Sequence, residues 1–579
     1  MTYDLLIKNG TVIDGSGLPR YRADVAVQHG RIVATGRIRE PAREVIDAEG
    51  HIVAPGFIDG HTHMDAQVNW DPLGTNSCWH GVTTAVMGNC GVGFAPMKSE
   101  RREFLIELME GVEDIPGAVL AEGVDWGWES FPEYLDVLAA KPRGMDLGAQ
   151  LPHAALRFYV MGERGAAREP ANADDLQRMA ELTEHALSAG ALGFTTSRTL
   201  LHKTARGEYV PNFGAAAQEL NAIAAGVKHA GCGVLQILSD FQDTETEFEM
   251  LCQWMKASGG RPLSFTLVQR LEMPEQWRRL LELIEEAQQR GLRVHGQVAP
   301  RAVGLVLGLQ ATLHPFMTKP SYLAIADLPL AERVRRMRDQ ELRGRILAEP
   351  FDALPGRIPA FIVDVLARLE RVFALGDPPE YEPPPEASVA ARAARLNCDP
   401  MALMYDLLLE RDGRELLFAP AANYVECNYD AALAMLHHPH TVVGLGDGGA
   451  HCGTICDGSY PTYLLTHWSR DRTRGVQLPL EFAVHRYTRA PAELIGLFDR
   501  GLIAPGLKAD INLIDHANLY LSPPSIVHDL PAGGRRLMQT AKGYVATIVS
   551  GEVVIDHDEH TGALPGSLLR GSRSDPRAR

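Results

Sequence analysis

Short apolar runs separated by turn residues occur near both ends of the chain. The N-terminal runs lie at residues 3–7, 11–13, 24–27 and 31–35, and each is followed by a turn that contains glycine. Near the other end, residues 509–515 and 545–555 have the same strand-like character. Strands this short cannot close a good core alone, so we expect the two groups to pair with each other.

Between these groups, apolar strand-like runs alternate with longer helical patterns. The pattern predicts strands at residues 81–87, 191–196, 234–238, 293–298 and 441–445, and helices at 174–189, 215–230 and 277–289. Such alternation is typical of parallel strands joined by helical crossovers. The extent of the region suits a TIM-type (β/α)8 barrel, in which catalytic residues lie at the C-terminal ends of the strands. The predicted fold class is therefore α/β.

One part of the barrel region is less regular. We predict an insertion over the barrel mouth at about residues 317–415, which includes a proline-rich run at 377–385 that cannot be helical. Two roles of this insertion are compatible with the sequence: a lid over the barrel mouth, and a covering segment without function. The predicted division of the chain is 1–55, 56–500 and 501–570, with a disordered tail at 571–579.

Composition narrows the class of partner. The 579 residues carry a net charge of −17, which argues against nucleic acid or an anionic membrane as the main partner. We expect no signal peptide, because the first residues show no basic region followed by an apolar one, and no membrane span, because no uncharged apolar run is long enough. The eight cysteines are scattered, so a disulfide framework is not expected. We expect a cytoplasmic protein with a small-molecule substrate, and a homo-oligomer is compatible with the sequence.

The stretch at residues 55–65 contains the strongest chemical signal. An apolar run leads into His61-Thr62-His63, and on an extended strand side chains two residues apart point the same way. Two imidazoles on one face can share a metal ion at roughly 2.0–2.1 Å each. The alternative is a pair of strand-end histidines bonded to backbone carbonyls.

Two motifs connect the chain to a known family. Residues 53–63 resemble the first barrel strand of the metal-dependent amidohydrolase superfamily. Gly88-Asn89-Cys90-Gly91 is similar to the segment that carries a metal-ligating cysteine in the N-acyl-D-amino-acid deacylase (D-aminoacylase) branch. The resemblance covers nearly the whole chain, though unevenly. It implies a barrel beside a small β-sandwich formed by both chain ends.

Cys90 and Asp447 are the next candidates. A thiolate binds Zn²⁺ at roughly 2.3 Å, although a single cysteine is often only a small buried hydrophobe. Asp447 follows the last apolar strand and matches the catalytic aspartate of the resembled superfamily. Such a carboxylate would bind the metal, accept a proton from water and pass it to the leaving nitrogen. A turn aspartate is the alternative, since Asp-Gly-Gly suits a turn.

The chain also departs from the resembled deacylases. They carry a histidine ligand near residues 234–240 and another near 262–268, where this chain has no histidine and offers Gln236 and Thr266. Glutamine and threonine are poor zinc ligands beside imidazole. We therefore expect one zinc ion, held by the set His61, His63, Cys90 and Asp447.

Other residues are secondary candidates. Three histidines near predicted strand ends could compensate for the missing ligands: His153, His295 and His451. Arg198 lies in a segment that resembles the border of the deacylase substrate pocket, where it could pair with a carboxylate. We take Arg198 and His153 as the substrate-binding candidates, ahead of Arg301 and Lys319.

The predicted function is metal-dependent hydrolysis of a C–N amide bond, with Asp447 as general base and acid. The resemblance implies an N-acyl amino acid as substrate, with the D configuration among the options. A cyclic amide or an ester is an alternative substrate. A non-catalytic binding or assembly protein of the same fold is the alternative in another class, and the replacements at Gln236 and Thr266 favour it. The joint presence of the four candidate ligands favours the enzyme.

Overall fold

The centre of the molecule is a series of parallel strands that follow one another in sequence order. The computed structural model describes residues 2–351 and 360–578. One sheet has the order β26-β8-β7-β6 and another the order β17-β13-β12-β11-β10-β9, with parallel pairing throughout. Only Gln150 separates β8 from β9, so the two sheets continue into each other. The strands are β6 (Phe57–Asp59), β7 (Val82–Met87), β8 (Asp146–Ala149), β9 (Leu151–Pro152), β10 (Gly193–Arg198), β11 (Val234–Ser239), β12 (Leu263–Thr266), β13 (Val294–Val298), β17 (Thr441–Val443) and β26 (Leu568–Leu569).

Amphipathic helices connect the parallel strands. In α9 the residues Trp277, Leu280, Leu283, Ile284 and Ala287 are buried, a spacing that places them on one face of a helix. The connecting helices are α3 (Phe131–Ala139), α4 (His153–Met161), α6 (Ala173–Ala189), α7 (Ala217–Ala230), α8 (Thr244–Ala257), α9 (Gln276–Gln289), α17 (Asp430–His437), α19 (Leu480–Tyr487) and α20 (Arg489–Ile495). The alternation confirms the predicted α/β class.

The loops after the first and last parallel strands are hydrogen bonded to each other. The His63 amide donates to the Gly448 carbonyl at 2.9 Å, and the Asp447 amide donates to the His61 carbonyl at 3.1 Å. The pairings found among the described residues include no ladder between β6 and β17. These two loop contacts bring the histidine and aspartate motifs to the same end of the strands.

Both chain ends contribute to one nine-stranded sheet. Strand β5 pairs antiparallel with β18, with Val53 opposite Leu513, and so joins the two ends. The apolar core under the sheet includes Leu5, Ile7 and Ile548. The strands are β1 (Tyr3–Val12), β2 (Tyr21–Gln28), β3 (Arg31–Gly36), β4 (Ala42–Asp47), β5 (Ile52–Pro55), β18 (Ile511–Ile514), β23 (Tyr544–Val549), β24 (Glu552–Asp556) and β25 (Glu559–His560).

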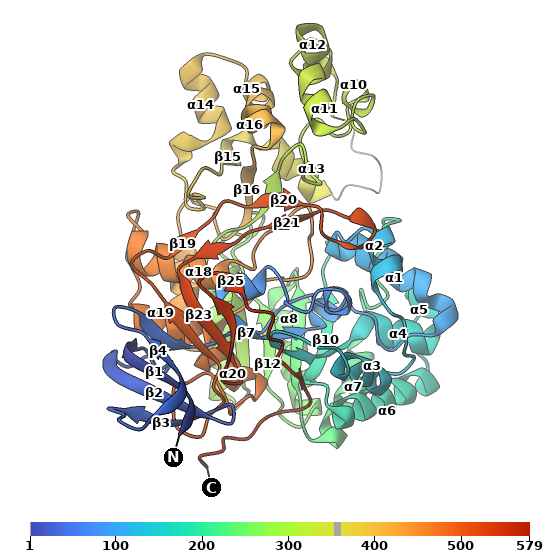
Figure 1. Cartoon of the computed structure of the whole chain (residues 1–579). Helices are drawn as coiled ribbons and strands as arrows, with labels where there is room; N and C mark the ends of the chain where they lie inside the picture. Colours follow the sequence, from blue (N-terminus) through green and yellow to red (C-terminus); the bar gives the residue numbers. More distant parts are fainter. Residues whose placement is uncertain (1, 352–359, 579) are drawn as a thin grey trace.

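A separate lobe follows β13 in the sequence. Strand β14 (Val303–Leu307) and β15 (Phe373–Ala374) both pair antiparallel with β16 (Leu417–Ala422). The lobe has its own apolar core, with Phe316, Met337 and Tyr405 fully buried. Its helices gather at the top of Figure 1: α10 (Pro320–Leu323), α11 (Leu330–Met337), α12 (Gln340–Ala348), α13 (Ala360–Ala367), α14 (Val389–Leu396), α15 (Pro400–Leu408) and α16 (Glu410–Gly413).

The C-terminal segment, which we expected to be disordered, lies against the loop after α20. The Arg573 amide donates to the Gly496 carbonyl at 2.8 Å, and the Phe498 amide donates to the Arg573 carbonyl at 2.9 Å. In the described parts of the chain, the helices are all too short or too polar to span a membrane.

Candidate metal centre

The candidate ligands lie in three loops at the C-terminal ends of parallel strands. His61 and His63 follow β6, Cys90 follows β7, and Asp447 follows β17. Cys90 has a φ of 54°, and Gly91 beside it has a φ of 75° and packs so closely that an added Cβ would lie 2.8 Å from the Thr196 Cα. The glycine therefore lets the cysteine loop pack closely against β10.

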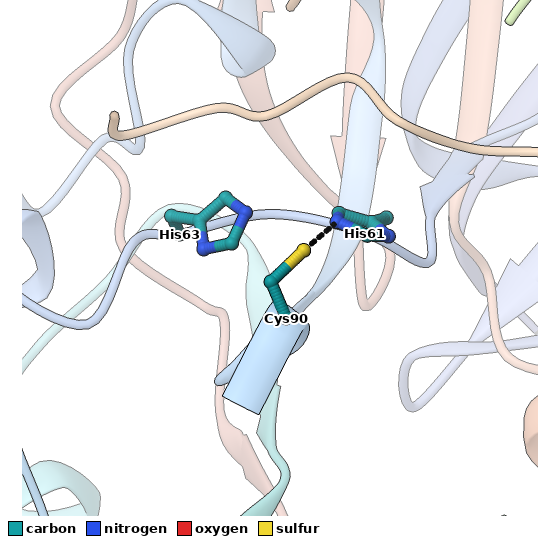
Figure 2. Close-up of side chains that lie close together, drawn as sticks. All are labelled: His61, His63 and Cys90. Carbon is teal, nitrogen blue, oxygen red and sulfur yellow. Dashed lines mark hydrogen bonds between the residues drawn. The ribbon is translucent and has the colours of Figure 1, made fainter. Parts of the chain in front are cut away.

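Two histidines and the cysteine converge on one point. Ligand atoms of His61, His63 and Cys90 all lie within 4.8 Å of one another, and all three residues are buried. The Cys90 Sγ lies 3.2 Å from the His61 Nε2, the contact drawn as a dashed line in Figure 2. The His63 ring lies on the other side of the Cys90 sulfur in this view.

Asp447 completes the group. Its Oδ1 lies 3.5 Å from the His61 Nε2 and 3.6 Å from the His63 Nε2. This buried oxygen has no hydrogen-bond partner among the described residues. The loop reaches this position through Gly449, which has a φ of 95° and whose added Cβ would lie 2.8 Å from the His63 carbonyl oxygen. The structure thus brings together all four residues of the predicted ligand set.

Burial controls the protonation of these groups. Burial lowers the pKa of His61 to about 4, although its bond to Gln297 opposes the shift, and burial also lowers the pKa of His63. Burial raises the pKa of Asp447, with a further contribution from Asp457, and burial raises the pKa of the Cys90 thiol. Both imidazoles are therefore neutral at neutral pH, with a lone pair available.

The donor set fits a divalent cation. Neutral imidazole nitrogen, thiolate sulfur and carboxylate oxygen are the ligands that zinc prefers in proteins. A cation among them would stabilise the ionised thiol and carboxylate that burial disfavours. The partnerless Asp447 oxygen, aimed at the same point as the two histidine nitrogens, supports this fit.

Three further residues contact this group. The His61 Nδ1 donates to the Gln297 Oε1 at 2.7 Å, and Gln297 lies on β13. Glu113 ends the helix α1 (Arg102–Glu113), and its Oε1 lies 3.2 Å from the His63 Nδ1. Its other oxygen lies 3.6 Å from the Nε2 of His451, which the sequence had raised as a candidate. Neither Gln297 nor Glu113 belongs to a motif that the sequence could reveal. Gln297 has one local signal, its position near the end of a predicted strand.

Gln236 and Thr266 stand where the resemblance expected histidines. The Gln236 Oε1 accepts a hydrogen bond from the Cys90 amide at 3.0 Å, so this side chain supports the cysteine loop. The Gln236 Nε2 and the Thr266 Oγ1 are buried, and within the described ranges neither has a hydrogen-bond partner.

The two substrate-binding candidates make their contacts with residues outside the ligand set. His153 is fully buried, and its ring nitrogens lie 2.8 Å from the Thr196 Oγ1 and 2.8 Å from the Glu219 Oε1. Arg198 ends β10, its side chain is partly exposed, and its Nη1 donates to the Ala215 carbonyl at 2.8 Å.

The remaining candidates are engaged elsewhere. Arg301 is buried against Tyr381 and pairs with Asp457 at 3.0 Å. The Lys319 Nζ donates to the Ile346 carbonyl within the lobe. His295 lies at the start of β13, at the end of the strand opposite to Gln297.

Parallel strands with histidine, cysteine and aspartate at their carboxyl ends are typical of metal-binding TIM-barrel hydrolases. The chain belongs to the amidohydrolase family, because the family model described as "Amidohydrolase family" matches residues 44–555. It is an enzyme of that class, whose members hydrolyse carbon–nitrogen bonds other than peptide bonds. The resemblance seen in the sequence is confirmed.

Relatives and solved structures agree with this assignment. The N-acyl-D-aspartate deacylase of Alcaligenes xylosoxydans xylosoxydans is 27% identical over 577 residues, which cover 98% of this chain and 95% of that protein. A D-aminoacylase mutant in complex with copper chloride aligns with a TM-score of 0.65 at 24% identity, covering 98% of this chain and 100% of that chain. The N-acyl-D-glutamate deacylase of Bordetella bronchiseptica, with zinc and a phosphonate mimic of the tetrahedral intermediate, aligns with a TM-score of 0.62 at 23% identity, covering 98% and 100%. These likenesses establish the fold, a TIM barrel with a small domain.

Proposed function

We propose that this enzyme is a metal-dependent hydrolase that cleaves the amide bond of an N-acyl amino acid. The observation that carries the proposal is the convergence of His61, His63 and Cys90 within 4.8 Å, with the Asp447 Oδ1 beside both histidines. Two relatives support the substrate class, since they are named as deacylases of N-acyl-D-aspartate and N-acyl-D-glutamate.

The four side chains have distinct roles in this proposal. His61, His63, Cys90 and Asp447 would hold the ion. A bound zinc ion would supply Lewis acidity and promote ionisation of water. Asp447 takes a proton from water as the water oxygen bonds to the carbonyl carbon. It then returns that proton to the nitrogen as the C–N bond breaks, which releases a carboxylic acid and an amine.

We infer one ion per chain. Gln236 uses its carbonyl oxygen for the Cys90 amide, and Thr266 offers only a hydroxyl, so neither supports a second zinc site. A solved D-aminoacylase is described as having a binuclear metal centre, with activation by one metal and attenuation by a second. A single ion therefore suffices for activation in that protein of related fold, which supports a one-ion site here.

Arg198 is the proposed contact for the substrate carboxylate. It lies at the carboxyl end of a barrel strand. Its partly exposed guanidinium donates to the Ala215 carbonyl through Nη1, and its Nε lies 3.9 Å from the Glu247 Oε2. A planar guanidinium suits bidentate pairing with a carboxylate. His153 is a weaker proposal for substrate binding, since Thr196 and Glu219 lie within hydrogen-bond distance of its ring nitrogens.

The proposed architecture follows the predicted division. We infer a closed (β/α)8 barrel at about 56–500, supported by the hydrogen bonds between the loops after β6 and β17. Residues 1–55 and 501–570 would form the small domain. The lobe around 317–415 would be the insertion; residues 352–359 of that prediction lie outside the described residues.

Metal content and amide hydrolysis test this proposal together. We expect about one zinc ion per chain by elemental analysis, release of amino acid from an N-acyl amino acid panel of both configurations, and loss of both in His61→Ala. His229→Ala, at an exposed position on α7, is the control and should retain both. Two ions per chain would contradict the single site. No metal after zinc is supplied would contradict the mechanism and favour a binding protein.

A further inference from the structure

Glu113 is a buried carboxylate wedged between two loops of the candidate metal centre. Only 1% of its surface is exposed. Its Oε1 lies 3.2 Å from the His63 Nδ1, and its Oε2 lies 3.6 Å from the His451 Nε2. Its backbone carbonyl accepts a hydrogen bond from the His451 amide at 2.5 Å. One residue of α1 therefore contacts the loop after β6 and the loop after β17.

The His63 ring has two nitrogens in different surroundings. The Nε2 faces Asp447, and the Nδ1 faces Glu113. Among the described residues, neither the His63 Nδ1 nor the Glu113 Oε2 has a hydrogen-bond partner. The 3.2 Å separation lies within the range of an N–H···O hydrogen bond, in which Nδ1–H would donate to Glu113. That bond would fix the tautomer whose lone pair lies on Nε2.

His61 offers a comparison within the same site. Its Nδ1 donates to the Gln297 Oε1 at 2.7 Å, which leaves the Nε2 lone pair facing Cys90 and Asp447. The Nδ1 of each histidine thus faces an acceptor from a different element, β13 for His61 and α1 for His63. Partners of this kind orient metal-binding histidines, and their removal typically weakens metal affinity about 10- to 100-fold.

We propose that Glu113 is a positioning residue that fixes the Nδ1–H tautomer of His63 and holds the Asp447–His451 loop against the His61–His63 segment. This inference rests on the proposed metal-dependent function. Glu113 contacts neither the reacting atoms nor the ion in this assignment, and it acts through His63 and the loop that carries Asp447.

The first test is zinc affinity, measured by competition with a chromophoric chelator. Glu113→Leu removes the acceptor and should weaken zinc binding about 10- to 100-fold. Glu113→Gln retains an acceptor oxygen and should restore most of the affinity. Glu110→Leu, an exposed position on the same helix, is the matched control and should bind as the parent does. Parent-like affinity in Glu113→Leu would overturn the proposal.

A second variant separates the loss of the Glu113 contact from misfolding of Glu113→Leu. Glu113→Asp keeps the charge but withdraws the carboxylate by one methylene, so it should also weaken zinc binding while remaining folded by circular dichroism. In the cobalt-loaded protein, its visible ligand-field bands should shift, because the His63 ring is no longer held. Parent-like affinity and bands in Glu113→Asp would contradict the inference.

The tautomer of His63 can be measured without metal. In metal-free protein with ¹⁵N-labelled histidine, long-range ¹H–¹⁵N spectra should show His63 protonated on Nδ1 in the parent and in Glu113→Gln. The signal, assigned by its loss in His63→Gln, should change to a mixture of tautomers in Glu113→Asp. A parent chain that binds no zinc would refute the proposed function, whereas an unchanged tautomer in Glu113→Asp would refute the role of Glu113.

Discussion

Gln297 contacts the nitrogen of His61 that faces away from the candidate metal centre. Its Oε1 accepts the Nδ1 proton at 2.7 Å. Gln297→Leu is similar in size and removes the acceptor, so we expect zinc affinity to fall about 10- to 100-fold in chelator competition, with the fold intact. Gln289→Leu, at the exposed end of α9, is the control. Equal affinities of the two variants would show that Gln297 does not orient His61.

The sequence could identify only the site residues that belong to motifs. His61, His63, Cys90 and Asp447 each follow an apolar strand in a glycine-containing segment, and the structure brings them together. Glu113 carries no such signal, because its contact depends on how the end of α1 approaches two loops. That approach is set by tertiary packing, which no local pattern records.

His153 shows that the local sequence does not reveal which distant residues a histidine contacts. It also lies near a strand end, yet its Nε2 contacts the Glu219 Oε1 on α7, 66 residues away. Arg157 pairs with the same carboxylate at 2.8 Å. A histidine engaged in a buried network and a histidine that binds substrate have the same local sequence character. Only the position of the distant partner distinguishes them.

At the scale of elements, the lobe after β13 was only partly visible in the sequence. The irregular stretch and the proline-rich run indicated an interruption of the barrel pattern. The antiparallel pairing of β14 with β16 could not be foreseen, because the residues it joins, such as Leu305 and Ala419, lie far apart in the chain. Strands this short carry too few positions for a periodic signal.

Glu382 anchors the proline-rich connector of this lobe to the barrel side. Its carboxylate accepts two hydrogen bonds from the Arg472 guanidinium, at 2.9 and 3.0 Å, and lies 2.7 Å from the His467 Nε2. Both charged partners are buried. Glu382→Ala leaves the Arg472 charge buried without this partner, so we expect the free energy of unfolding to fall by about 3–5 kcal/mol.

Calorimetry of the metal-loaded protein measures this effect as a lower unfolding temperature. Glu386→Ala, at an exposed position immediately after the proline-rich run, should unfold at the temperature of the parent. Zinc content should be unchanged in both variants, since Glu382 is not part of the ligand set. Identical unfolding temperatures for the two variants would show that the connector is held by other contacts.

At the scale of the whole molecule, the two ends of the chain could be matched from the sequence because each has strands without a partner nearby. The structure joins them through β5 and β18 in one sheet. The sequence did not indicate how this sheet is fixed to the barrel. A buried ionic group provides one link: Asp146 on β8 lies 2.7 Å from both the Arg500 Nη1 and the Lys508 Nζ.

Asp146 also accepts a hydrogen bond from the Ser567 amide at 2.8 Å, so it contacts two parts of the C-terminal region. Burial alone would raise the pKa of this carboxyl, but Lys508 and Arg500 lower it to about 2. An unperturbed aspartate has a pKa of about 3.9, so the ionised form is favoured in the folded chain by about 2 kcal/mol. This stabilisation is complete above about pH 4 and is lost as the pH falls towards 2.

Asp146→Asn lacks this pH-dependent contribution and leaves two cations without their shared partner. We therefore expect the variant to be less stable than the parent at pH 6, and the difference in free energy of unfolding to shrink between about pH 4 and pH 2. Urea unfolding at several pH values, followed by tryptophan fluorescence, measures that difference. Asp327→Asn, at an exposed position, should show no such convergence. A difference that stays constant down to pH 2 would mean that Asp146 is not ionised in the folded protein and contributes no pH-dependent link between the end sheet and the barrel.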